Sequence, residues 1–166
     1  PKDLSDELIA AYGELKHLMP HLHLPVQAGD DEILRRMNRR YNREHYLDLV
    51  RRLRAARPDI GLTTDIIVGF PGETEAQFEQ TLSLVDEVRY DSAYTFIYSP
   101  RVGTKAASMP DDTPAEEKSR RIQTLIAKQQ AITSEILSGM VGTTAEVLVE
   151  SVSARDAGWV GGKSPR

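Results

Sequence analysis

Short runs rich in β-branched and apolar residues alternate with amphipathic segments along most of the chain, and this alternation limits the possible folds more than any other feature. Residues 21–27 alternate in polarity, residues 60–70 form an apolar run, and residues 92–99 are rich in aromatic and β-branched side chains. Each predicted strand is followed by a segment with helical periodicity. Strands separated by helices predict parallel pairing with right-handed crossovers, so we expect an α/β fold.

Two of the predicted helices have clear start signals. Thr74 and Gln77 have the spacing of a capping box. Thr113 followed by Pro114 predicts the start of a long helix that continues to about Ser138. Helices are predicted over residues 5–17, 31–37 and 43–57, after Thr74, and over 113–138.

The last predicted strand, residues 145–151, follows a glycine turn and breaks the alternation because no helix comes after it. We therefore interpret residues 1–140 as a segment of a parallel βα barrel or open sheet, and residues 141–166 as the start of a small β domain. Three parallel strands make a poor closed core. Because the first residue is Pro1 and the tail is rich in turn residues, we expect a piece of a longer protein; the alternative is processing of the ends.

Composition excludes several classes of protein. The 166 residues are 40% hydrophobic and 28% charged, as in ordinary soluble globular proteins. No apolar run approaches the roughly 20 residues that span a bilayer, and no signal peptide is visible, so we expect no membrane association and a cytoplasmic location. Since there is no cysteine, disulfides and thiolate metal ligands are excluded. The net charge of −4 argues against wholesale wrapping by nucleic acid but allows a local basic patch.

Polar and glycine residues gather where each predicted strand ends. Ligands of parallel βα folds bind at the carboxyl ends of the strands, so these residues are the first candidates for a site. The first strand ends in Gln27, the second runs into the turn from Gly69 to Glu73, and the third leads to Tyr98 and Arg101. Glycine in such a turn permits close approach of a planar ligand, but it is also common there for steric reasons.

Three charged or titratable features each allow two explanations. Asp65 interrupts an apolar strand, so it either pairs with Arg39 or backbone N–H groups or binds vicinal hydroxyls such as those of a ribose. The five arginines in residues 35–43 form either a solvated helix and turn or an anion-facing patch. His21 and His23 have a spacing that could serve a metal, but no third ligand is evident, and we favour core or rim histidines.

Three stretches resemble the radical S-adenosylmethionine methylthiotransferases, in the order and spacing of that family. They read "LHLPVQAGDDEILRRMNRRYNREHYLDLVRRLR", "TTDIIVGFPGETEAQFEQTLSLVDEVRYDSAYTFIYSPRVGT" and "VGTTAEVLVE". The resemblance is strongest to the branch that forms 2-methylthio-N6-dimethylallyladenosine in tRNA. It implies that residues 1–140 are the C-terminal half of a radical SAM TIM-like βα barrel and that residues 141–166 begin a TRAM domain.

The resemblance also implies a site. Gln27 and Asp65 match residues that bind the ribose of S-adenosylmethionine in related enzymes, and Arg39 matches an arginine that meets its methionyl carboxylate. The turn after the second strand resembles the ledge against which the adenine lies. The implied cofactor-binding residues are Gln27, Gly29, Arg39, Asp65, Gly69, Phe70, Pro71 and Glu73, and the implied substrate-binding residues are Tyr98 and Arg101.

The chain departs from the family pattern at three positions. Ala28 and Asp30 stand where the family usually has serines, which puts any contact made by those serines in doubt. Val102 replaces the usual proline of the "YSPRPGT" loop and should loosen it slightly. The cluster motif CxxxCxxC is absent, so the ligands of the [4Fe–4S] clusters would lie outside this chain.

The resemblance therefore implies part of a transferase that uses S-adenosylmethionine and iron–sulfur clusters to add a methylthio group to C2 of N6-prenylated adenosine in tRNA. The implied partners are tRNA and a sulfur donor, and exposed sheet edges would favour pairing between copies of the chain. The basic, glycine-rich tail favours this branch over the one that modifies an aspartate of a ribosomal protein. A non-catalytic binding or assembly module is the other alternative, since the chain lacks cysteine.

Overall fold

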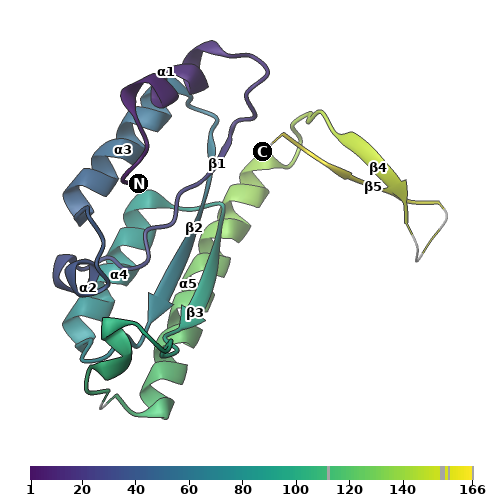
Figure 1. The fold of residues 1–166 in the computed structure, drawn as a ribbon. Helices are drawn as coiled ribbons and strands as arrows, with labels where there is room; N and C mark the ends of the chain where they lie inside the picture. Colours follow the sequence, from purple (N-terminus) through teal and green to yellow (C-terminus); the bar gives the residue numbers. More distant parts are fainter. Residues whose placement is uncertain (112, 154–155, 157, 166) are drawn as a thin grey trace.

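The computed structural model describes residues 1–111, 113–153, 156 and 158–165. Helices and strands alternate through the first part of this range, as the sequence predicts, and an antiparallel hairpin follows (Figure 1). The elements are α1 (Asp6–Glu14), β1 (His21–His23), α2 (Asp31–Arg36), α3 (Arg43–Ala56), β2 (Gly61–Val68), α4 (Glu75–Val88), β3 (Ser92–Ile97), the 3₁₀ helix η1 (Lys105–Ser108), α5 (Ala115–Met140), β4 (Leu148–Val152) and β5 (Val160–Lys163).

The three strands of the main sheet are parallel and lie in the order β1-β2-β3. In the register of this sheet His23 lies beside Thr63, and Asp65 beside Tyr94. The expected α/β fold with parallel pairing is therefore confirmed.

The helices cover one face of this sheet. Leu62, Thr64, Ile66 and Val68 of β2 are fully buried, and they belong to or border a core that includes apolar side chains of α3, α4 and α5. The side chains between them on β2 are half-buried, and their neighbours Tyr94 and Phe96 on β3 are 61% and 51% exposed. Since alternate strand residues face opposite sides, the second face of the sheet is open within the described part of the chain.

The predicted strand over residues 21–27 is too long. Regular pairing ends at His23 because Pro25 has no N–H to donate, and the Val26 N–H turns to the Thr64 hydroxyl at 3.0 Å. The chain then pairs once more, through a bridge between Gln27 and Ile66. The irregular segment therefore carries Gln27 one step further along the sheet edge.

The helix ends follow the local signals with one exception. The capping box predicted at Thr74 is present, because its side chain and that of Gln77 each accept from the other's backbone N–H. The long helix does not start at Thr113 as predicted: its N-cap is Pro114, whose side chain accepts no hydrogen bond, and the helix starts at Ala115. Asp30 is the N-cap of α2 and accepts from the Ile33 N–H at 2.9 Å, a task that a serine also performs.

The C-terminal strand has a partner that the sequence reading did not include. β4 covers Leu148–Val152 rather than residues 145–151, and β5 pairs with it antiparallel. β5 contains Gly161 and Gly162, and a Cβ on Gly162 would lie 2.5 Å from the Leu148 carbonyl oxygen. Close approach to the neighbouring backbone thus explains glycine in this strand.

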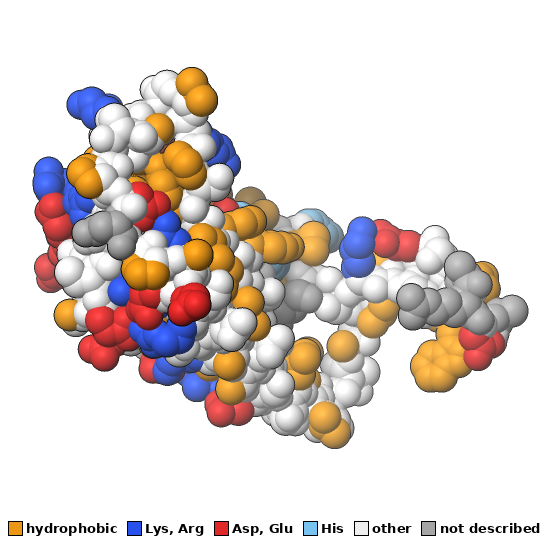
Figure 2. All heavy atoms as spheres, turned by 90° about the horizontal axis from the view of Figure 1, so that it is seen from below, with side chains coloured by type: hydrophobic (Ala, Val, Ile, Leu, Met, Phe, Trp, Pro, Cys, Tyr) orange, Lys and Arg blue, Asp and Glu red, His pale blue; other side chains and the backbone are white. Residues whose placement is uncertain are grey.

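The hairpin projects to one side of the α/β layer. Figure 2 shows the molecule of Figure 1 from below, with the hairpin extending away from the α/β layer and hydrophobic side chains at its surface. These include Leu148, Val152 and Trp159, which are between 64% and 69% exposed. None of the described helices is long and apolar enough to cross a membrane.

Candidate functional site

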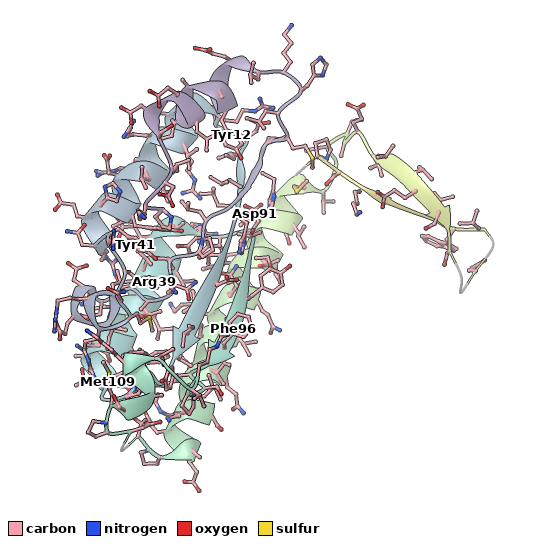
Figure 3. All side chains as sticks on the ribbon, in the orientation of Figure 1. Tyr12, Arg39, Tyr41, Asp91, Phe96 and Met109 are labelled. Carbon is pink, nitrogen blue, oxygen red and sulfur yellow. The ribbon has the colours of Figure 1, made fainter. Side chains whose placement is uncertain are left out.

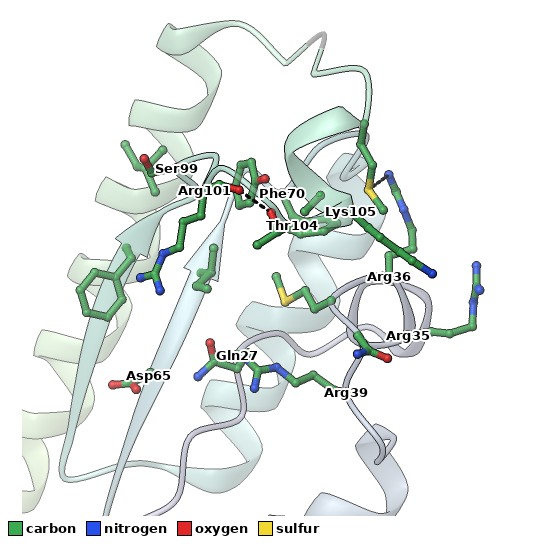
Figure 4. A pocket seen from close by; sticks show the side chains of 18 of the residues that line it. Gln27, Arg35, Arg36, Arg39, Asp65, Phe70, Ser99, Arg101, Thr104 and Lys105 are labelled. Atoms are coloured by element: carbon green, nitrogen blue, oxygen red, sulfur yellow. Dashed lines mark hydrogen bonds between the residues drawn. The ribbon is translucent and has the colours of Figure 1, made fainter.

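A cavity of about 1270 Å³ opens beside the carboxyl ends of the strands. Its wall comes from the segment after β1, from α2 and the residues that follow it, from the open face of β2 and β3, and from the loop between β3 and α5 (Figure 4). Figure 3 marks Arg39, Phe96 and Met109, which represent three of these segments. Of the predicted site residues, six line the cavity: Gln27, Arg39, Asp65, Phe70, Tyr98 and Arg101.

Gln27 has an unusual backbone. Its φ of 74° lies in the left-handed region, which costs a residue with a Cβ about 1–2 kcal/mol. Hydrogen bonds hold it there, since its N–H donates to the Asp65 carbonyl and its own carbonyl accepts from the Ile67 N–H, both at 2.9 Å. The side-chain amide forms no hydrogen bond with any described residue and borders the cavity. The fold therefore maintains a strained residue whose amide is available to a ligand.

Two tyrosines support the segment before Gln27. The Tyr46 hydroxyl donates to the Leu24 carbonyl at 2.8 Å, and the Tyr41 hydroxyl donates to the Val26 carbonyl at 3.0 Å. These bonds satisfy carbonyls that the interrupted strand leaves without a sheet partner.

Asp65 is not a buried carboxylate, contrary to the structural explanation considered from the sequence. It lies within β2 on the open face, and its side chain is 30% exposed. Its nearest charged or titratable partner is not Arg39 but His23, whose Nε2 lies 3.4 Å from Asp65 Oδ1. In Figure 4 the Asp65 carboxylate, the Gln27 amide and the Arg39 guanidinium lie along one side of the cavity.

The two strand histidines join a short polar chain on this face. His23 Nδ1 lies 2.9 Å from the Thr63 hydroxyl, and His21 Nε2 lies 3.2 Å from the same oxygen. Among the described residues no group of three His, Cys, Asp or Glu side chains could hold a metal ion. The histidines instead contact Thr63 and, through His23, Asp65.

The arginine run is divided between structural and open roles. Arg35 makes two bonds to Glu32, at 2.7 and 2.6 Å, and Arg43 donates to the Gln80 carbonyl and to Glu87. Arg36 donates to the Pro71 carbonyl. The Arg39 side chain forms no hydrogen bond or ion pair with the described residues and faces the cavity. Arg35, Arg36 and Arg39 of this run line the cavity, and the anion-facing patch stays a prediction.

Four of the predicted cofactor-binding residues do not line the cavity: Gly29, Gly69, Pro71 and Glu73. Gly29 packs on α4, where an added Cβ would lie 2.4 Å from the Gln80 carbonyl oxygen. Gly69 has a φ of 68°, and its close neighbour is the side chain of Lys118. Steric explanations therefore account for both glycines within this chain.

Glu73 belongs to a buried ion pair. Its Oε2 accepts from the Gly69 N–H at 2.7 Å and from Arg121 at 3.0 Å, and both charged side chains are at most 5% exposed. Burial raises the pKa of Glu73, while the bonds from Gly69 and Arg121 oppose that rise. Arg121 also donates to Glu117 and lies over the Phe78 ring. The pair fastens the turn after β2 to α5.

The end of the cavity opposite Asp65 is formed by the loop after β3. The Tyr98 ring packs edge-on against Phe70 at 5.1 Å between centroids, and its hydroxyl is buried without a hydrogen-bond partner among the described residues. Arg101 and Lys105 both line this end. Sequence reasoning missed Lys105, which nothing local marks. It noted the shared spacing of His21 and His23 but did not predict the contact of His23 with Asp65.

The matched family decides the assignment of this fold and cavity. The family model "Radical SAM superfamily" matches residues 1–85. The chain belongs to the radical SAM superfamily. Within this superfamily the match covers β1, β2 and the residues Gln27, Arg39 and Asp65 that meet at the cavity.

Individual relatives extend the similarity along almost the whole chain. A tRNA-2-methylthio-N(6)-dimethylallyladenosine synthase of Erythrobacter litoralis is 54% identical over 99% of this chain and 37% of its own length. The proteins of the same name from a Thermoanaerobacter species and from Carboxydothermus hydrogenoformans are 54% and 52% identical, over 95% and 99% of this chain and 33% and 37% of their own lengths. The chain thus spans about a third of the length of these curated relatives.

Proposed function

We propose that this chain is the part of a radical SAM methylthiotransferase that holds S-adenosylmethionine, and that the complete enzyme adds a methylthio group to C2 of N6-prenylated adenosine in tRNA. The observation that carries this proposal is the high identity, over 99% of the chain, to a relative named for that product. The relatives' names favour the tRNA branch over the branch that modifies a ribosomal protein.

The cavity supports the cofactor assignment because it offers the groups that S-adenosylmethionine needs. The Asp65 carboxylate would accept hydrogen bonds from the ribose hydroxyls, and the Gln27 amide would contact the same sugar. Arg39, whose guanidinium has no partner among the described residues, would pair with the methionyl carboxylate. Phe70 lines the cavity and is almost fully buried.

The chain itself would bind and orient, while the cofactor and its iron–sulfur cluster supply the radical chemistry when bound. Clusters of this kind are held by cysteine thiolates, and this sequence contains none. The ligands would therefore come from another part of the complete enzyme.

In the complete enzyme we assign residues 1–140 to a radical SAM barrel and residues 141–166 to the start of a TRAM-like domain that meets tRNA. The outer edges of β1 and β3 are where further barrel strands, or a second copy, would pair. A sulfur donor and a cytoplasmic location complete the proposal.

The substitution Asp65→Asn in the complete enzyme tests the cofactor site. It keeps the size of the side chain and one acceptor oxygen but removes the charge, so S-adenosylmethionine should bind about ten- to a hundredfold more weakly, or about 1.4–2.8 kcal/mol. Asp59→Asn is the matched control, because Asp59 is an exposed carboxylate paired with Arg57 and does not line the cavity.

Calorimetric titration and thermal unfolding should be measured on the same samples. The expected result is weaker binding with a nearly unchanged melting temperature, since Asp65 is partly exposed. A lower melting temperature with unchanged affinity would remove the ribose assignment.

A further inference from the structure

The cavity of about 1270 Å³ offers polar groups beyond those assigned to the cofactor. Its polar groups fall into two sets (Figure 4). One set is Gln27, Arg39 and Asp65, and the other comes from the loop after β3. The second set is therefore available to a second ligand.

The charge of the cavity wall is opposite to that of the chain. Among its lining residues are five cationic side chains and two carboxylates, Glu32 and Asp65, although the chain as a whole has a net charge of −4. Glu32 is already engaged by Arg35. The cavity is thus a local positive site on an acidic protein, which favours an anionic ligand.

Two of these cations remain unassigned once the cofactor is placed. Arg101 and Lys105 form no side-chain hydrogen bond or ion pair with the described residues. The turn between them is fixed by the Thr104 hydroxyl, which donates to the Arg101 carbonyl at 2.8 Å. In Figure 4 their side chains extend toward opposite sides of the cavity. They therefore flank its mouth rather than converge on one point.

We propose that Arg101 and Lys105 bind the phosphodiester groups on the two sides of the nucleoside that enters this cavity. The inference rests on the proposed function, since an RNA substrate must present its target base unpaired and brings a phosphate on each side of it. An arginine fork and a lysine ammonium both suit phosphate oxygens. Two cations on opposite sides of an opening match this arrangement better than they match a single carboxylate.

The Tyr98 hydroxyl is a second, independent indication of a ligand at this end. Tyr98 lines the cavity, and its hydroxyl is buried and forms no hydrogen bond with any described residue. A buried hydroxyl without a partner costs about 1–3 kcal/mol, so such groups usually have one in the working state. A polar atom of the bound nucleotide would supply it.

The salt dependence of RNA binding tests this proposal. The complete enzyme is titrated with an RNA stem-loop that carries the prenylated adenosine in its loop, at several salt concentrations. Each phosphate contact with a single strand contributes about 0.7 to the slope of log K against log salt concentration. Arg101→Gln and Lys105→Gln should each reduce the magnitude of this negative slope by about 0.7, and the double variant by about 1.4. At 0.15 M salt each loss corresponds to binding that is about fourfold weaker.

Three comparisons make the outcome decisive. Lys128→Gln removes the same charge from a lysine that pairs with Asp86 outside the cavity, and it should leave the slope unchanged. Tyr98→Phe should weaken RNA binding without changing the slope, because it removes no charge. The affinity for S-adenosylmethionine should be unchanged in all these variants.

If the slope of log K against log salt concentration is the same for the wild type, Arg101→Gln and Lys105→Gln, the phosphate assignment alone is overturned. A wild-type enzyme that does not bind the RNA at all would overturn the proposed function, and the present inference with it. Because both side chains are exposed and unpaired among the described residues, the variants should fold normally, and circular dichroism checks this.

Discussion

Two buried tyrosines give the sharpest stability prediction because their hydrogen bonds have a fixed direction. Tyr90 donates to the Tyr46 oxygen at 3.0 Å, and Tyr46 donates its one proton to the Leu24 carbonyl at 2.8 Å. Both rings are fully buried. The Leu24 carbonyl also accepts from Thr64 at 3.0 Å.

The substitution Tyr46→Phe should therefore cost more than Tyr90→Phe. Tyr46→Phe leaves the Leu24 carbonyl with its second donor but leaves the buried Tyr90 hydroxyl without an acceptor, at a cost of about 1–3 kcal/mol. Tyr90→Phe leaves no donor without an acceptor, since Tyr46 still donates to the Leu24 carbonyl, and it should cost about 0.5–1 kcal/mol. For a domain of this size about 1 kcal/mol corresponds to roughly 2–4 °C, so Tyr46→Phe should lower the melting temperature by about 2–12 °C.

Thermal unfolding followed by circular dichroism, with the double variant included, tests this reasoning. In the Tyr90→Phe background the Tyr90 hydroxyl is already absent, so Tyr46→Phe leaves no donor without an acceptor and should cost less there than alone. If Tyr90→Phe destabilises the protein as much as Tyr46→Phe, the assigned direction of the chain of bonds is wrong.

Three further predictions concern the packing of Gly29, alkaline pH and iron. Gly29→Ala would place a Cβ 2.4 Å from the Gln80 carbonyl oxygen and 2.5 Å from the Thr81 Cα. Calorimetric unfolding should therefore show that the free energy of unfolding falls by about 1–3 kcal/mol, while cofactor affinity is unchanged. Unchanged stability with weaker cofactor binding would make Gly29 a ligand contact. Burial raises the pKa of Tyr46 and Tyr90 above their ordinary value of 10.0 in the folded state, so their contribution to stability is present below about pH 10 and is lost as the pH rises. In a pH series of urea unfolding, Tyr90→Phe should therefore lose less stability at alkaline pH than the wild type does. Anaerobic reconstitution of this chain alone with iron and sulfide should leave it colourless, and a broad visible absorption band would show that ligands other than cysteine hold a cluster.

Features that depend on neighbouring residues could be predicted from the sequence, and features that depend on distant pairs could not. The capping box at Thr74 and Gln77 involves residues three apart, so its pattern is visible locally. The parallel sheet follows from the alternation of strands and helices. The pairing of Glu73 with Arg121 joins residues 48 positions apart, and nothing near Glu73 distinguishes a buried ion pair from a ligand contact.

The candidate site shows the same division. The resemblance placed Gln27, Arg39 and Asp65 together, and the structure brings all three to one cavity. The backbone of Gln27 could not be predicted, because left-handed φ is rare for a residue with a Cβ and here depends on bonds to β2. The contact of His23 with Asp65 likewise required the strand register.

Helix α5 sets the distance between two parts of the molecule, the end of the α/β layer at the cavity and the C-terminal hairpin. With 26 residues at about 1.5 Å each, it is about 39 Å long. Its first turns lie beside the turn after β2, where Lys118 meets Gly69, and the hairpin starts eight residues after its last residue (Figure 1). The helix is fastened along its length, since Gln129 and Thr133 donate to the carbonyls of Tyr90 and Asp91. Under the proposed function, a substrate that reaches both the cavity and the hairpin has to span a distance comparable to this length, which a single nucleoside cannot do.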